Sequence, residues 1–221
     1  MPDLTPKKPI IIAVDGPAAS GKGTLARRIA AHFNYAFLDT GSLYRALAYD
    51  VLRRGEAPAD ASASLRAAKK LNMAMLDDPD ILAALRTDAV GTAASVVAAQ
   101  PETRGAILQI QRDIADTPPD GKAGAVLDGR DIGTNVCPNA AHKIFVTARA
   151  EIRAKRRWQE LRQHNPQVSL EDVLADLNAR DQRDSARATA PMRAARDAHL
   201  LDTSDLSIEE AFEAALALVS H

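Results

Sequence analysis

A glycine-rich stretch near the start of the chain has the residue types and the spacing of a phosphate-binding loop. Gly16, Gly21 and Lys22 match the pattern Gly-x4-Gly-Lys, and an apolar stretch comes before them. Glycines allow backbone N–H groups to approach phosphate oxygens, and the lysine can reach the terminal phosphates. A plain turn between a strand and a helix is the alternative. We predict that phosphate groups bind to Gly16, Pro17, Ala18, Ala19, Ser20, Gly21, Lys22, Gly23 and Thr24.

One position of this loop departs from the strict pattern, which has Ser or Thr directly after the lysine as a ligand to Mg²⁺. Gly23 stands there, and Thr24 comes one place later. A second candidate for the metal is Asp128, which ends the apolar stretch AGAVLD. Ligands bind beyond the carboxyl ends of parallel strands, so Asp128 is placed to orient Mg²⁺ through water. An aspartate that merely caps a turn is the alternative.

Arginines gather in two segments of a chain that is otherwise electrically neutral. Residues 149–162 hold an excess of four positive charges, and Arg180, Arg183 and Arg187 recur at helical spacing with Asp184 among them. We expect these three arginines to lie on one helical face. Transfer of a phosphoryl group brings many negative charges into one cleft, and arginines are suited to neutralise them. A solvated helix and a self-neutralised face are the alternatives.

Strands and helices alternate along the chain, which predicts a doubly wound parallel sheet. Apolar stretches predict strands at 9–15, 35–38, 123–128, 143–148 and 199–202. Amphipathic spacing predicts helices at 24–33, 42–52, 150–163, 169–184 and 207–219, and another from Pro101 to the breaker cluster at 117–122. The Ala-rich segment 64–100 has no strand periodicity, so we expect a helical insertion there.

Length, charge and cysteine content narrow the possible classes of protein. The chain has 221 residues, a net charge of −1 and one cysteine, Cys137. One domain is expected, without disulfides, in the cytoplasm. Neutral charge and an aromatic content of 4% argue against binding of a nucleic acid polymer. No segment has the length of a membrane span, and a monomer is the default expectation.

Several motifs together resemble the bacterial cytidylate kinase family. They are VDGPAASGKGT, FLDTGSLYRALA, AASVVAAQPETR, LDGRDIGT and RDQRDSARATAP, in this order, and the resemblance covers residues 10–219. It implies one P-loop kinase domain over 1–221, with three α/β layers and a five-stranded parallel sheet. It also implies a nucleoside-monophosphate-binding insert at 55–100 and an Arg-rich lid at 153–168. The implied reaction moves the γ-phosphoryl group of ATP, with Mg²⁺, to CMP or dCMP.

The same resemblance implies where the acceptor nucleotide binds. Ser95, Arg104 and Asp131 match the positions that contact the cytosine ring, and Asp184 and Arg187 match those on the pentose. One region departs from the long form of the family, whose insert carries a small β-sheet. Residues 64–94 are shorter here and have a helical pattern.

The resemblance further implies which residues handle the phosphates. Lys22, Arg130 and Arg180 are the implied catalytic cations, and Arg45 joins Arg130 on the acceptor phosphate. Further implied positions are Thr40 and Tyr44 in the lining of the acceptor site and Arg153, Arg156 and Arg157 in the lid.

Two other functions remain open at the level of sequence. The acceptor could be UMP, AMP or a hydroxyl metabolite such as shikimate, which a panel of acceptors with ATP and Mg²⁺ distinguishes. A nucleotide-dependent switch would hydrolyse nucleotide slowly without any acceptor. The guanine-binding signature Asn/Thr-Lys-x-Asp of GTPase switches is absent from the chain.

The phosphate-binding loop generates a first prediction. Lys22→Ala should lower kcat by orders of magnitude while the protein stays folded, because the lysine neutralises phosphate charge in the transition state. Steady-state kinetics together with circular dichroism test this. A variant with a near-normal kcat would remove the assignment of the loop.

Overall fold

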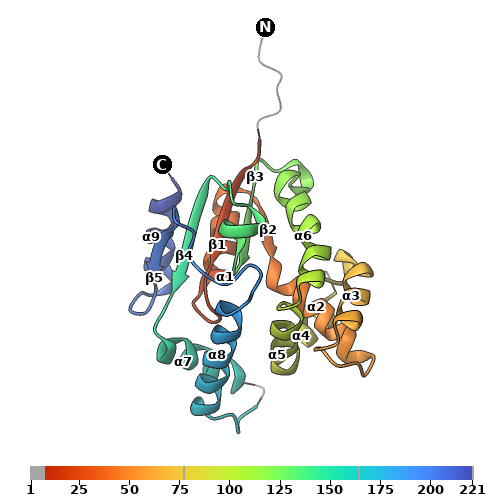
Figure 1. Cartoon of the computed structure of the whole chain (residues 1–221). Coiled ribbons are helices and arrows are strands. Elements are labelled where there is room, and N and C mark those ends of the chain that lie inside the picture. The colour runs from red at the N-terminus through yellow and green to blue at the C-terminus, as the bar shows by residue number, and fades with distance from the viewer. Residues whose placement is uncertain (1–7, 77, 164, 221) are drawn as a thin grey trace.

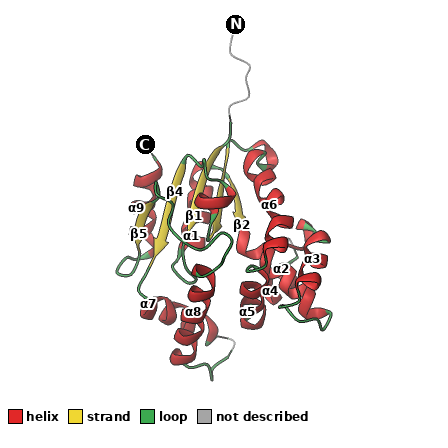
Figure 2. Ribbon diagram, in the orientation of Figure 1, coloured by secondary structure: helices red, strands yellow, loops and turns green. Residues whose placement is uncertain are grey.

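Five parallel strands form one sheet in the order β2-β3-β1-β4-β5 (Figure 2). The computed structural model describes residues 8–76, 78–163 and 165–220. The strands are β1 (Ile10–Asp15), β2 (Ala36–Asp39), β3 (Gly124–Gly129), β4 (His142–Thr147) and β5 (His199–Asp202). All the predicted strands are present, within one residue at each end.

Helices cover both faces of this sheet because its strands are apolar on both faces. Ile12 and Val14 of β1 pack toward α1 (Lys22–Phe33) and α9 (Ile208–Val219). Ala13, between them, packs toward α6 (Pro101–Asp116) and a short π-helical turn, η3 (Ile132–Val136). The predicted three-layer α/β fold is confirmed.

The segment between β2 and β3 forms a helical unit beside the sheet (Figure 1). It contains α2 (Thr40–Arg53), α3 (Ala61–Lys69), η1 (Met73–Leu76), α4 (Pro79–Leu85) and α5 (Asp88–Val97). These helices share an apolar cluster of their own, which includes Leu43, Leu47, Val97 and Ile107 of α6. Short helices joined by turns make up the described part of 64–100, where the absence of strand periodicity predicted a helical insertion.

Two further helices lie beyond the carboxyl ends of the strands, α7 (Ala150–Leu161) and α8 (Leu170–Ser185) (Figure 1). They pack on each other, and α8 also contacts α5 of the insert. The prediction of three arginines on one face of this helix was wrong for Arg187. Because α8 ends at Ser185, Arg187 lies in the loop that follows.

A side-chain cap accounts for one difference between the predicted and observed helix ends. Asp39 accepts a hydrogen bond from the N–H of Ser42, 3.2 Å, so α2 begins two residues before the predicted position. A capping box between Ser207 and Glu210 starts α9 within one residue of the predicted helix start. Among the described residues, no helix combines the length and the apolar character that crossing a bilayer requires.

Substitution of Gly124 tests the packing at the start of β3, and substitution of Gly105 in α6 provides a comparison. A Cβ on buried Gly124 would lie 2.5 Å from the carbonyl oxygen of Ile10 and 2.8 Å from the Tyr35 ring. Gly124→Ala should therefore lower the free energy of unfolding by about 1–3 kcal/mol. Nothing lies within 4 Å of a Cβ on Gly105, inside α6. Gly105→Ala should raise stability by up to about 1 kcal/mol, since alanine favours helix.

Urea denaturation of both variants provides the measurement. Equal effects of the two substitutions would mean that β1 and β3 adapt to an extra methyl group without cost.

Candidate active site

The predicted phosphate-binding loop connects β1 to α1, at the carboxyl edge of the sheet. Gly21 has a φ of +85°, which side-chain-bearing residues rarely adopt, and it precedes the first residue of α1. Lys22 is buried, and its Nζ donates to the carbonyl of Pro17 at 3.3 Å. The Nζ also lies 3.7 Å from Oδ1 of Asp128. A cation and a carboxylate therefore face each other where the terminal phosphates of a nucleotide would bind.

Burial changes the acidity of both members of this pair. Desolvation lowers the pKa of Lys22, and the neighbouring Arg130 acts in the same direction. Desolvation raises the pKa of Asp128, while the charge of Lys22 opposes that effect. Asp39 pairs with Asp128 in register on the adjacent strand and brings another carboxylate to this edge. Both charged partners are thus costly to bury, and a phosphate or a metal ion would relieve that cost.

The unusual glycine after the lysine has a steric explanation in the tertiary structure. A Cβ on Gly23 would lie 2.9 Å from Oδ2 of Asp128. A serine or threonine at this position would therefore contact the carboxylate directly. Thr24, one residue later, is exposed and lines a neighbouring cavity.

Side chains from distant segments brace the loop from outside. Arg153 is buried on α7 and donates to the carbonyl of Ala18 at 3.2 Å. Its guanidinium also pairs with Asp181 of α8 at 2.7 Å. From the loop after β5, the hydroxyl of Thr203 donates to the carbonyl of Ser20 at 2.9 Å. Arg153, predicted as a lid residue, is therefore attached to the phosphate-binding loop.

A cavity of about 520 Å³ opens next to this loop. Arg156, also predicted in the lid, donates to the carbonyl of Thr203 at 2.7 Å and forms part of its wall. The rest of the wall comes from α1, α7 and the start of α9, including Thr24, Gln159, Leu206 and Ile208. The cavity is large enough for a nucleoside beside the phosphate-binding loop.

The predicted acceptor residues meet in a second pocket. A small pocket of about 40 Å³ has a wall that contains Thr40, Tyr44, Ser95, Arg104, Arg130, Asp131, Arg180, Asp184 and Arg187. These residues come from α2, α5, α6, the end of β3 and α8 with its following loop. The tertiary structure thus brings together all the predicted acceptor residues except Arg45.

Ion pairs inside the protein fill most of this pocket. Arg104 donates to Asp131 at 2.5 Å, and both side chains are buried. Asp184 accepts from Arg130 at 3.1 Å, from Ser95 at 3.2 Å and from Arg187. Although burial alone would raise it, the pKa of Asp184 is lowered by the charges of the surrounding arginines.

Three groups in the pocket keep unused hydrogen-bonding capacity. The Nε atoms of Arg104, Arg180 and Arg187 are buried without a partner among the described residues. Burial lowers the pKa of Arg180 to about 9, and the adjacent charges of Arg130 and Arg45 act in the same direction. Cations crowded in this way are ready to bind an anion.

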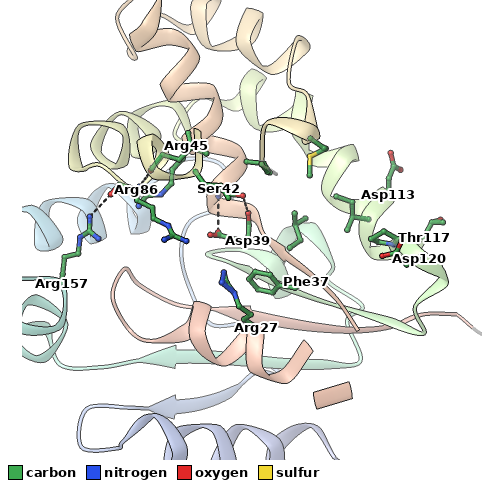
Figure 3. Close-up of a pocket in the computed structure, with 17 residues that line it drawn as sticks. Arg27, Phe37, Asp39, Ser42, Arg45, Arg86, Asp113, Thr117, Asp120 and Arg157 are labelled. Atoms are coloured by element: carbon green, nitrogen blue, oxygen red, sulfur yellow. Dashed lines mark hydrogen bonds between the residues drawn. The ribbon is translucent and has the colours of Figure 1, made fainter. Parts of the chain in front are cut away.

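Arg45 is absent from the wall of the small pocket around Asp184. It lines a larger cleft beneath the insert (Figure 3). Its guanidinium donates to the carbonyl of Leu85, at the end of α4, at 2.7 Å. The cleft has a volume of about 1100 Å³ between the insert, β2 and the end of α6. Arg157, the third predicted lid residue, also lines this cleft and forms an ion pair with Asp88 of α5 at 2.7 Å. In this structure Arg45 and Arg157 thus bind to the insert.

Sequence analysis missed several polar residues of the site. Thr203 and Asp181 lack any local motif, because their role is to hold elements from elsewhere in the chain. Asp15 ends one predicted strand and Asp39 directly follows another, and this position at the carboxyl edge of a parallel sheet could have identified them.

The fold and the phosphate-binding loop together define a P-loop kinase. Among solved structures, the shikimate kinase of Bacteroides thetaiotaomicron is similar with a TM-score of 0.50 and 12% identity, covering 96% of this chain and 99% of that one. This likeness concerns the fold alone. The family model for cytidylate kinase matches residues 12–221.

Curated relatives point to the same family. The cytidylate kinase of Rhodospirillum rubrum is 57% identical over 212 residues, 96% of this chain and 98% of that protein. The cytidylate kinase of Azorhizobium caulinodans is 55% identical over 210 residues, covering 95% and 98% respectively. The chain belongs to the cytidylate kinase family, and the predicted phosphotransferase function is confirmed. This result decides against a nucleotide-dependent switch.

The bracing of the loop by Arg153 generates a prediction. Arg153→Met should lower the free energy of unfolding by about 1–3 kcal/mol, because buried carbonyls and Asp181 lose their donor. It should also raise KM for ATP more than KM for CMP, since Ala18 belongs to the phosphate-binding loop. Arg149→Met, which removes an exposed ion pair with Asp205, is the control.

Thermal unfolding and steady-state kinetics give both quantities. A normal KM for ATP in a destabilised Arg153 variant would show that this contact supports only the fold.

Proposed function

We propose that the acceptor nucleotide binds in the pocket between α2, α5, α6 and α8, with its phosphate directed toward Lys22. The observation that carries this proposal is the buried pair of Arg104 and Asp131 in one pocket with Arg130 and Arg180. A polar pair of this kind suits the edge of a base, and the arginines suit a phosphate. The resemblance to the family assigns the same residues to the acceptor.

Cytosine offers an amine donor and an unprotonated ring nitrogen that accepts. A carboxylate or hydroxyl facing the amine, here Asp131 or Ser95, and the guanidinium of Arg104 facing the acceptor atoms would favour it. The unpartnered Nε of Arg104 supports this assignment, because a buried donor without a partner is costly. The guanidinium also lies 5.5 Å from the ring of Tyr44, which limits its orientation.

Nucleotide binding requires an exchange of partners in this pocket. Its volume of about 40 Å³ is far too small for a nucleoside monophosphate. The ion pairs of Asp184 with Arg130 and Arg187 must therefore open or rearrange. Asp184 and Arg187 would then bind the pentose of CMP or dCMP, while Arg130 binds the phosphate, joined by Arg45 after it leaves Leu85.

The acceptor phosphate is already a nucleophile, so the reaction requires positioning and charge neutralisation more than a base. Lys22 would stabilise the terminal phosphates of ATP from one side. Arg130 and Arg180 would stabilise the transferring group from the other. The partial burial of these cations strengthens their interaction with the developing charge.

The residues at this edge also fit a magnesium ion bound with ATP. Oδ1 of Asp128 is buried and has no hydrogen-bond partner among the described residues, and carboxylate and hydroxyl oxygens are ligands that Mg²⁺ accepts. Asp128 would hold the ion through water, with Thr24 as the second contributor. When bound, Mg²⁺ would neutralise charge on the phosphates of ATP.

The donor nucleoside, the lid and the monophosphate-binding insert can each be assigned to a part of the fold. The cavity of about 520 Å³ beside Thr203 is suited to the nucleoside of ATP. The segment 153–168 would form a lid over the donor, although Arg153 holds its first turn against the loop. The helical segment 55–100 would close over the acceptor as the monophosphate-binding insert.

Selection of the base provides the sharpest test of the proposed acceptor site. Arg104→Met should lower kcat/KM for CMP by roughly 5- to 150-fold, because each buried group left unpaired costs about 1–3 kcal/mol. The ratio of kcat/KM for CMP to that for UMP should narrow, and KM for ATP should change little. Initial rates with CMP, dCMP, UMP and AMP measure these effects.

Gln109→Met, on the exposed face of the same helix, is the control. An unchanged CMP/UMP ratio in a folded Arg104 variant would contradict the proposed contact with the base.

A further inference from the structure

The buried carboxylate of Asp15 has no part in the mechanism described above, yet it contacts the segment that carries two acceptor residues. Asp15 is the last residue of β1 and is 5% exposed. Its Oδ1 accepts from the N–H of Ile132 and its Oδ2 from the N–H of Gly133, both at 2.8 Å. These amides begin η3, directly after Arg130 and Asp131.

The side chain of Asp131, which is in the position to cap this turn, makes other hydrogen bonds. Asp131 is in the N-cap position of η3, but its side chain makes no capping hydrogen bond. Its carboxylate instead accepts from Arg104 at 2.5 Å and from Nδ2 of Asn135 at 3.0 Å. Asp15 thus accepts hydrogen bonds from the backbone of η3, while the carboxylate of Asp131 contacts Arg104 in the proposed acceptor pocket.

Among the described residues, no cation forms an ion pair with the carboxylate of Asp15. Lys143 is the cation whose stem lies against Gly133, 3.1 Å from an ideal Cβ on that glycine. Its Nζ, however, donates to the carbonyl of Pro138 at 2.6 Å and to Asp197 at 2.7 Å. Among the described residues, the amides of Ile132 and Gly133 are therefore the hydrogen-bond donors to the Asp15 carboxylate.

We infer that Asp15 is a positioning residue for base selection: it caps η3 in place of Asp131 and so leaves the Asp131 carboxylate directed at the acceptor base. This inference rests on the proposed role of Asp131 and Arg104 in contacting cytosine. It also connects the two substrate sites, because Gly16, the next residue, begins the phosphate-binding loop.

The physical reason is competition for the same amides. Without the carboxylate of Asp15, the N–H groups of Ile132 and Gly133 would be buried and unpaired, which is costly. The nearest residue able to satisfy them is Asp131 in the N-cap position. A capping Asp131 would turn away from Arg104, and the acceptor pocket would lose its fixed carboxylate.

Asp15→Asn tests this inference with little change of shape. The asparagine keeps one acceptor oxygen but presents an NH₂ group to the second amide. We expect kcat/KM for CMP to fall about tenfold, the loss of roughly one hydrogen bond. The CMP/UMP ratio should narrow, while KM for ATP changes less than KM for CMP. Amide hydrogen exchange at Ile132 and Gly133 should become faster.

Two comparisons separate positioning from a purely structural role. Asp60→Asn is the matched control, because Asp60 likewise accepts from two backbone amides, those of Ser62 and Ala63, at the start of α3. It should change stability and leave the CMP/UMP ratio as in the wild type. In an Asp131→Asn background, Asp15→Asn should have no further effect on that ratio, since both act through one carboxylate.

Gly133→Ala perturbs the same cap from the donor side and serves if Asp15→Asn does not fold. Its methyl group would lie 3.4 Å from Oδ2 of Asp15, and a smaller narrowing of the ratio is expected. Faster amide exchange with an unchanged ratio, while Asp131→Asn does change the ratio, would overturn the inference. An unchanged ratio in Asp131→Asn itself would instead overturn the proposed contact of Asp131 with the base, and with it the role of Asp15.

Discussion

Charge pairing around Asp184 is the interaction on which the proposed acceptor site depends. The side chain is 1% exposed and connects α8 to the end of β3 through Arg130, to α5 through Ser95 and to the following loop through Arg187. Removing one partner of such a cluster leaves a charge buried and unpaired, which destabilises far more than an exposed ion pair contributes. The cluster thus holds several arginines close together despite their mutual repulsion.

The same pairing explains how the site can be ordered and still bind highly charged substrates. Before a nucleotide binds, the charged side chains of the site form hydrogen bonds with one another at distances near 3 Å. The phosphate, hydroxyl and base groups of a nucleotide can replace these partners. Little further desolvation of the protein is then required, because its charged side chains are already out of water. The proposed donor side follows a similar scheme: Arg153 and Thr203 donate to backbone carbonyls of the loop, and Lys22 and Asp128 face each other beside it.

The fold was largely predictable because its signals are local. Apolar stretches such as PIIIAVD fit a strand buried on both faces, and the loop GPAASGKGT joins such a strand to a helix. Helix ends were less accurate, since caps such as Asp39 with Ser42 depend on backbone geometry that periodicity does not describe. Arg187 was misplaced for a related reason: its spacing from Arg180 fits a helix that in fact ends at Ser185.

The sequence by itself determined the class of fold, the phosphate-binding loop and the family. These features depend on residue types at short spacings, which can be recognised without knowing which residues meet in space. The proposed acceptor residues came from the resemblance to the family, and the fold brings all of them except Arg45 to one pocket. Only the tertiary structure decided which charges neutralise which. The pairing of Arg104 with Asp131, the attachment of Arg153 to the loop, and the cap that Asp15 supplies to η3 join residues 27, 135 and 117 positions apart. Such pairings depend on burial and distance, and these quantities exist only once the strands have assembled.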